Sequence, residues 1–336
     1  MFEQIFKFLA SLKLTVVCLA FAAVLVFLGT IAQVDEGLYA AQARYFRSLL
    51  IYWSPKGADW HVPVFPGGYL VGAVLVSNLT AAFGVRVRQW RGRIGLLMTH
   101  AGLILLLLGQ FATDQLSVES HMRLVQGEPT SFSESGNQSE LAVIETTDPN
   151  SDQVFPVPES MLAQRREIRL PELPFVIHVR KYFKNTSVYQ CDPQATNQPP
   201  PAASQGLGQR LVLQSEPPTS KLDERNRPAA VVELILPQGS LGTWAVALVL
   251  DQAQPVTVDR RSFTLRLRST RFYRPYTITL LQFTHEKYAG TDIPKNFASR
   301  IRLEDSKAGE NREMLIKMNR PLRYAGETYY QSGYDE

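Results

Sequence analysis

One apolar stretch with a histidine inside it constrains this chain of 336 residues more than any other feature. The run from Ile94 to Phe111 is nearly long enough for a helix that crosses a bilayer core of about 30 Å. His100 is the titratable group within the run. An ionisable side chain inside a membrane helix needs a partner there and marks a functional site by default. We therefore predict a membrane protein with His100 as its first candidate for chemistry.

Two further segments fit membrane helices, and the charge between spans sets a topology. Residues 14–34 form a continuous apolar run that fits an uncleaved span better than a signal peptide, and residues 67–85 form a weaker span. The third span is predicted over residues 94–112. The loop before it, RVRQWRGR at residues 86–93, has four arginines and no acid, a cytoplasmic signature under the positive-inside rule. We predict a cytoplasmic N-terminus and an extracytoplasmic location after residue 113.

Composition argues against several classes of function. The formal charge of +4 and the pI near 9 would suit nucleic-acid binding, but the densest basic run joins two predicted spans, so no nucleic-acid partner is expected. The two cysteines, Cys18 and Cys191, form neither a CxxC pair nor a CxxCH motif. The chain therefore has no dithiol redox site and is not itself a c-type cytochrome. Hydrolase and kinase motifs are also absent from the sequence, and we predict no catalytic residue.

The first loop outside the cytoplasm, residues 35–65, is rich in aromatic side chains such as Tyr52, Trp53 and Trp60. Tryptophan and tyrosine gather where acyl chains meet water, because each has an apolar ring and a polar tip. This loop is therefore expected to lie against the outer membrane surface. His61 falls within it and is expected to be an ordinary surface histidine.

From residue 114 onward the pattern changes to short runs that alternate apolar and polar residues between turn residues, which is typical of antiparallel sheet. We predict three N-terminal transmembrane α-helices and a large, mainly-β extracytoplasmic domain over residues 114–336, sandwich-like or barrel-like. Residues 188–228 are rich in Pro, Gln, Ser and Asn and are predicted to be a disordered insertion. His121, His178 and His285 have no second ligand at helical or turn spacing, so none is predicted to bind a metal.

The surroundings of His100 leave two roles open. At roughly 1.5 Å per residue His100 lies about 9 Å past Ile94, in the cytoplasmic half of the bilayer. Gly95, Thr99, Gly102 and Gly109 form a small-residue stripe that is predicted to pack against a neighbouring helix, and His100 points about 140° away from Gly95. Burial favours the neutral imidazole, which has a nitrogen that can bind a metal. From the residues alone, an interhelical hydrogen bond and a haem or metal ligand are equally compatible with His100.

Three stretches resemble the ResB family, also called CcsB, membrane proteins of the type II system (system II) of cytochrome c biogenesis. They are SLKLTVVCLAFAAVLVFLGTIAQ at residues 11–33, MTHAGLILLLLG at residues 98–109, and a closing signature of FTHEKYAGTDIPKNFASRIRLED at residues 283–305 followed by MLIKMNRPLRYAGETYYQSGY at residues 314–334. The resemblance covers most of the chain outside residues 188–228. The family usually has a fourth, C-terminal span, and we predict that it is missing here.

The resemblance implies a function in haem handling. Family members pair with a second membrane protein, CcsA or ResC, which has a tryptophan-rich segment. The pair delivers haem across the bacterial cytoplasmic (inner) membrane and supports its attachment to the CxxCH cysteines of apocytochrome c. The histidine of the family's third span, an axial haem ligand, corresponds to His100. The resemblance therefore favours the ligand role for His100, with haem b bound transiently and the second ligand supplied by the partner.

The implied protein is a subunit of a haem-attachment (haem lyase) complex that does not act alone. A thiol-reducing protein is implied as an indirect partner, because this chain has no CxxC with which to keep the substrate cysteines reduced. The alternative is a haem-free, membrane-tethered β scaffold or chaperone that assembles another membrane complex.

Overall fold

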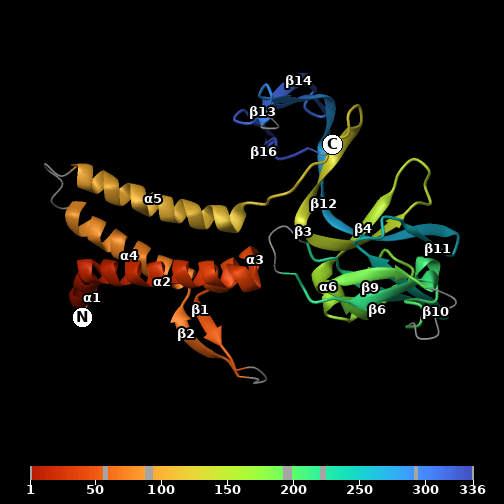
Figure 1. Cartoon of the computed structure of the whole chain (residues 1–336), viewed down its shortest axis with the longest axis horizontal. Coiled ribbons are helices and arrows are strands. Elements are labelled where there is room, and N and C mark those ends of the chain that lie inside the picture. Colours follow the sequence, from red (N-terminus) through yellow and green to blue (C-terminus); the bar gives the residue numbers. More distant parts are fainter. Residues whose placement is uncertain are drawn as a thin grey trace. The chain divides into compact units, whose positions relative to one another are not determined.

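The computed structural model describes residues 2–55, 60–87, 94–191, 199–219, 225–290 and 294–334. The chain divides into two compact units (Figure 1). The first unit consists of Met1–Val118 with Glu216–Asn226, and the second of Glu119–Ser215 with Arg227–Glu336. The long helices belong to the first unit and most of the strands to the second.

Three helices of the first unit are long and apolar enough to cross a membrane: α2 (Leu12–Glu36), the Gly68–Val85 part of α4 (Gly68–Val87) and α5 (Ile94–Leu116). A short amphipathic helix, α1 (Phe2–Leu9), precedes α2. These helices confirm the membrane part of the predicted fold class. Most of the arginine-rich loop on which the predicted topology depends, residues 88–93, lies outside the described residues.

A buried asparagine joins α4 to the break between α1 and α2. Asn78 is 1% exposed, and its Nδ2 donates to the carbonyl oxygens of Leu9 at 2.5 Å and Ser11 at 3.1 Å. Its Oδ1 accepts from the Thr15 hydroxyl at 2.7 Å. The last carbonyls of a helix have no intrahelical partner, and lipid offers none. Asn78 therefore satisfies the end of α1 from within the unit.

The chain between α2 and α4 folds back along α2. It contains α3 (Leu38–Ala41), a short π-helix η1 (Gln42–Phe46), and a hairpin of β1 (Leu50–Trp53) and β2 (Val62–Pro66). The reversal begins at Gly37, whose φ of 80° favours glycine. Gly29 makes the return possible, because a Cβ there would lie 2.7 Å from Cε2 of Phe46. The core of this unit consists of Cys18, Leu25, Ile51 and Val71.

The second unit is built from two main antiparallel sheets. The four-stranded sheet has the order β10-β9-β6-β5 and consists of β5 (Glu167–Ile168), β6 (Val176–Phe183), β9 (Ala229–Leu236) and β10 (Gly239–Ala247). The larger sheet has the order β14-β13-β12-β3-β4, with β11 also paired to β12. Its strands are β3 (Pro129–Glu145), β4 (Gln153–Pro158), β11 (Gln254–Val258), β12 (Arg261–Lys287), β13 (Pro294–Asp305) and β14 (Glu310–Lys317).

Smaller elements complete the second unit. They are a two-stranded sheet of β7 (Thr186–Gln190) and β8 (Leu211–Ser215), a second one of β15 (Leu322–Tyr324) and β16 (Glu327–Tyr329), the helix α6 (Glu159–Ala163) and the 3-10 helix η2 (Gly206–Arg210).

Two hydrophobic cores lie in the second unit, and β12 contributes to both. The first core lies between the four-stranded sheet and one half of the larger sheet, where Phe263 and Leu265 of β12 are fully buried. The second core gathers around Tyr276 and Ile278 of the same strand, with residues from β13, β14 and β15. The predicted mainly-β domain is confirmed, and the first core makes it sandwich-like.

Part of the segment predicted to be a disordered insertion, residues 188–228, has regular structure. β7 and β8 pair from Thr186↔Ser215 to Gln190↔Leu211, and Ala203 and Val212 are buried. The prediction was wrong for residues 199–215, because the apolar run that forms β8 pairs with β7 and buries side chains despite the polar composition around it. Residues 192–198 and 220–224 lie outside the described residues.

A buried ion pair joins β3 to β12 within the larger sheet. Arg268 and Glu140 lie opposite each other in the register, and Nε of Arg268 donates to Oε1 of Glu140 at 3.0 Å. Their side chains are only 6% and 5% exposed. Arg268 also donates to the hydroxyl of Tyr273 at 3.2 Å. Each charge is thus buried together with the group that compensates it.

We expect Arg268→Met to lower the free energy of unfolding by about 3–5 kcal/mol, because it leaves the Glu140 carboxylate buried without its partner. The double variant Arg268→Met/Glu140→Leu is expected to recover most of that loss. Urea unfolding of the full chain, with and without Trp244→Phe, measures both, because the difference in tryptophan emission belongs to Trp244 in the first core. The exposed pair Arg302–Glu313 is the matched control, because Arg302→Met there should cost no more than about 1 kcal/mol. Equal losses of unfolding free energy at the two ion pairs would contradict the conclusion that burial makes Arg268–Glu140 the more important pair.

Candidate functional site

His100 lies in the first half of α5, and a backbone carbonyl of the same helix fixes its ring. Nδ1 of His100 lies 2.8 Å from the carbonyl oxygen of Leu96, one turn earlier. A carbonyl oxygen only accepts hydrogen bonds, so Nδ1 has to carry the proton in this contact. In the neutral imidazole the lone pair then belongs to Nε2.

This arrangement leaves Nε2 as the nitrogen that could bind a metal. Metal-binding histidines characteristically donate their other ring N–H to a carboxylate or a backbone carbonyl, which fixes the tautomer and the orientation of the ring. Leu96 provides that carbonyl for His100. The side chain therefore fits one axial position of a haem iron, and the ligand role of His100 stays a prediction.

α5 packs along α4 and leaves the rest of its surface open. No residue of α5 is buried among the described parts of the chain, and His100 itself is half-buried. A Cβ built on Gly95, Gly102 or Gly109 would meet no atom within 4 Å. The tight packing predicted for this glycine stripe is thus not provided by any described segment of the chain. The open face can accept a helix or a cofactor from outside the chain.

A polar cluster at the end of α5 fixes this helix to α4. Oδ2 of Asp114 accepts from the Tyr69 hydroxyl at 2.5 Å, and Oδ1 of Asp114 pairs with Nη2 of Arg47 at 2.8 Å. Gln115 donates to the Tyr69 hydroxyl at 2.7 Å. Because a helix is stiff, these bonds also restrain the rotation of α5 about its axis and hence the direction in which His100 points.

The four other histidines do not gather into a metal site. His61 is exposed beside the β1–β2 hairpin, and His121 is exposed where its backbone pairs with β3. Nδ1 of His178 lies 3.9 Å from a carboxylate oxygen of Glu233, and the ring of His285 lies in a stack of aromatic rings. Among the described residues, no group of three or more His, Cys, Asp or Glu side chains could hold a metal ion.

The closing signature of the sequence folds around one carboxylate in the second core. Glu327 accepts hydrogen bonds from Nε of Arg274 at 2.7 Å, from the Tyr276 hydroxyl at 2.9 Å and from the Tyr329 hydroxyl at 2.5 Å. Gly326, with φ of 81°, forms the turn that brings Glu327 into place. Sequence reasoning used this signature for the resemblance without giving it a role. Its role in the structure is to close the second core.

The same contacts shift the ionisation of the signature residues. The hydrogen bond from Arg274 holds the pKa of Glu327 below its ordinary value, and the bonds from Tyr329 and Tyr276 act in the same direction. Burial, together with the bond to Glu327, raises the pKa of the Tyr329 hydroxyl. At neutral pH the cluster therefore contains a carboxylate and two protonated phenols.

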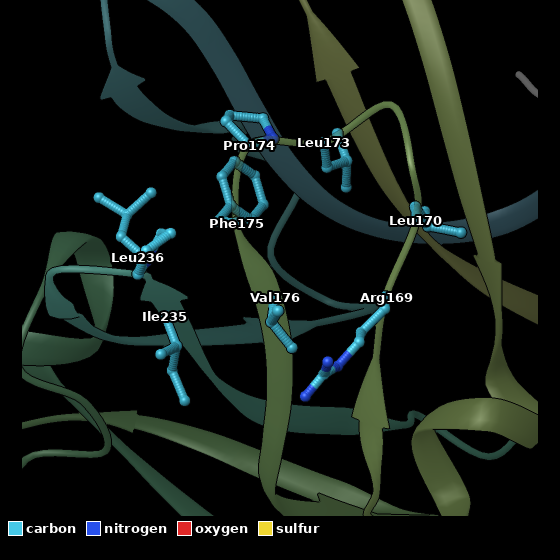
Figure 2. A pocket seen from close by; sticks show the side chains of 9 residues that line it. Arg169, Leu170, Leu173, Pro174, Phe175, Val176, Ile235 and Leu236 are labelled. Carbon is cyan, nitrogen blue, oxygen red and sulfur yellow. The ribbon is translucent and has the colours of Figure 1, made fainter.

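An apolar groove of about 260 Å³ lies beside β6 and the end of β9. Figure 2 shows Phe175, Val176 and Leu236 lining it together with Arg169. Arg169 pairs with Glu167 at 2.8 Å on the surface. The lining is otherwise aliphatic and aromatic, so the groove offers contact area without acid–base chemistry.

These features define a membrane protein in which three apolar helices, one of them with a ring-fixed histidine, accompany a large β domain. Residues 228–336, from β9 to the end of the chain, match the ResB-like family. This match confirms the resemblance to the ResB family, whose closing signature lies within the matched residues. The ResB-like family is linked to cytochrome c biogenesis. A search of curated proteins found no match.

We expect Glu327→Gln to make the protein less stable at neutral pH and less sensitive to acid. Because the pKa of Glu327 is lowered in the folded state from its ordinary 4.5, its contribution to stability is complete above that value and is lost as the pH falls through the lowered pKa. Thermal unfolding of the full chain between neutral pH and pH about 3 measures this. Glu313→Gln, at an exposed position, is the control. A Glu327→Gln chain that loses as much stability on acidification as the unchanged chain would contradict the assignment.

Proposed function

We propose that this protein is the haem-binding subunit of a membrane complex that attaches haem to apocytochrome c, and that His100 is one axial ligand of the haem iron. The observation that carries the proposal is the hydrogen bond between Nδ1 of His100 and the Leu96 carbonyl, on a helix with an open apolar face. It presents Nε2 as the nitrogen with the lone pair. The family match over residues 228–336 supports a role in cytochrome c biogenesis.

A CcsA- or ResC-like membrane protein completes the site in this proposal. One imidazole occupies one side of the iron, so the second axial ligand comes from that partner. The tryptophan-rich segment belongs to the partner as well, because the four tryptophans of this chain are scattered at positions 53, 60, 90 and 244. The open glycine face of α5 supports a close approach by a partner helix.

Haem, His100 and a thiol-reducing protein have separate roles in this proposal. Haem supplies the vinyl groups that become bonded to the cysteine thiols of the CxxCH motif. His100 holds and orients haem b transiently, and the apolar surface of α5 keeps water from the ring. A thiol-reducing protein keeps the substrate cysteines reduced, since this chain has no CxxC.

The proposal places the protein in the bacterial cytoplasmic membrane with its N-terminus in the cytoplasm. The four arginines of residues 86–93 support this orientation under the positive-inside rule. The second unit is then extracytoplasmic, on the side where apocytochrome c receives haem. Its apolar groove beside Phe175 and Leu236 supports a role in holding an extended segment of the apocytochrome.

We expect His100→Ala to abolish the Soret absorbance of the complex purified together with its CcsA-like partner, because the iron loses one axial ligand. Added imidazole is expected to restore part of the absorbance. Thr99→Ala is the matched control: the Thr99 hydroxyl donates to the Gly95 carbonyl of its own helix at 2.9 Å, so this change should leave the spectrum as it was. An unchanged spectrum in His100→Ala complex that still assembles would favour the haem-free scaffold.

We expect a chain that ends at Val118 to remain in the membrane and to lose binding of apocytochrome c, because the proposed presenting surface belongs to the second unit. Pull-down of an apocytochrome that contains CxxCH, by the full chain and by the shortened chain, measures this. Retained helicity in the shortened chain is the control. Equal binding by both chains would show that the apocytochrome is held elsewhere.

A further inference from the structure

The β1–β2 hairpin is an exposed apolar element in the first unit. Residues 49–55 and 60–66 contain no Lys, Arg, Asp or Glu. The side chains of Tyr52, Trp53, Trp60 and Val64 are each between 50% and 56% exposed. The two tryptophan rings meet edge-to-face, with 6.4 Å between their centroids. The described strands thus expose aromatic and aliphatic side chains, and the charged residues between them, Lys56 and Asp59, lie outside the described residues.

A two-stranded sheet alone is marginally stable at best in water. Pro63 and the register shift between Ile51 and Tyr52 limit pairing at the strand edges, but neither covers the exposed rings. Only its base is packed: Ile51 is buried, and Phe65 contacts the Phe21 ring of α2 edge-on, with 5.2 Å between centroids. The part that contains Trp53 and Trp60 therefore needs an environment less polar than bulk water.

The base of the hairpin lies where α4 begins and α5 ends. The amide of Gly67 donates to Leu49 O at 2.9 Å, and the amide of Tyr69 donates to Ser48 O at 3.2 Å. The cluster around Asp114 fixes the end of α5 at the same level. In Figure 1 the hairpin leaves the helices sideways from this region instead of continuing along their axes.

The length of α4 sets the depth of this level in a bilayer. Its 20 residues, at roughly 1.5 Å each, span about 30 Å, which is the thickness of the hydrocarbon core. The start of α4 and the base of the hairpin then lie at the boundary between acyl chains and headgroups. The hydrocarbon core itself is unsuitable, because the free edges of a two-stranded sheet would leave backbone groups without hydrogen-bond partners there.

We propose that the β1–β2 hairpin lies in the headgroup layer of the membrane, with Trp53 and Trp60 as its anchors. The layer provides acyl chains for the rings and water or headgroups for the indole N–H groups, the Tyr52 hydroxyl and the strand edges. The hairpin thereby fixes the depth of α4 and α5. The predicted topology, with a cytoplasmic N-terminus, places this headgroup layer in the outer leaflet. The position of the hairpin does not depend on whether the protein binds haem.

The depth of the two tryptophans tests the proposal. The full chain and its Trp53→Phe/Trp60→Phe variant are placed in phosphatidylcholine vesicles whose acyl chains are brominated near the carbonyl end or near the chain terminus. The emission that the variant lacks belongs to Trp53 and Trp60. We expect this difference emission to be blue-shifted and to be quenched more by the shallow bromines than by the deep ones.

A matched variant provides the control. Trp244 is 6% exposed in the first core, so the emission lost in Trp244→Phe should be insensitive to both brominated lipids. Difference emission of Trp53 and Trp60 that neither lipid quenches would overturn the proposal. If aqueous iodide quenched it, the hairpin would be in water, and if iodide failed too, protein would cover it. Stronger quenching by the deep bromines would also overturn the assignment to the headgroup layer.

Discussion

The first unit depends on one constraint, which is that lipid offers no hydrogen-bond partners. Several polar side chains in its apolar helices form hydrogen bonds with oxygens of the protein. Asn78 satisfies the end of α1, and Thr30 and Thr99 donate to carbonyls one turn earlier in their own helices. His100 follows the same rule through Leu96. For the threonines the bond only removes a cost, whereas for histidine it also selects the tautomer. The constraint that shapes the helices thus also fixes which ring nitrogen of His100 has the lone pair.

The second unit solves a different problem, because β12 has to serve two cores at once. Arginines along β12 pair with glutamates of β3 across the sheet: Arg261 with Glu145, Arg268 with Glu140 and Arg271 with Glu134. The register between the two strands shifts between Ser269 and Arg271 and again after Tyr273, which is where the strand passes from one core to the other. The ion pairs Arg268–Glu140 and Arg271–Glu134 lie on either side of the first shift. They hold β12 and β3 together between the two cores. Ion pairs between β12 and β3 therefore stabilise the part of the sheet that lies between the two hydrophobic cores.

Sequence patterns predicted what depends on local spacing and missed what depends on distant partners. The apolar runs gave the three helices because span length is a local property, and alternation gave the β domain. The pairing of β7 with β8 was missed because a polar composition conceals a short apolar run whose partner lies more than twenty residues away. The role of Glu327 was hidden for a similar reason, since Arg274 and Tyr276 come from another strand. For the candidate site, the sequence identified His100, but only coordinates could give its hydrogen bond to Leu96.

In the proposed function, the site on α5 is half of a haem site, and its construction supports a role in transfer. This chain sets the tautomer of His100 through Leu96, and it restrains the rotation of α5 and its position along α4 through the Asp114 cluster. The second ligand of the iron would come from the partner. In the proposed function, a haem held by one imidazole from each of two proteins is oriented while they are together and released when either withdraws. A complete pair of ligands on one chain would bind haem more tightly and would hinder its delivery to the apocytochrome.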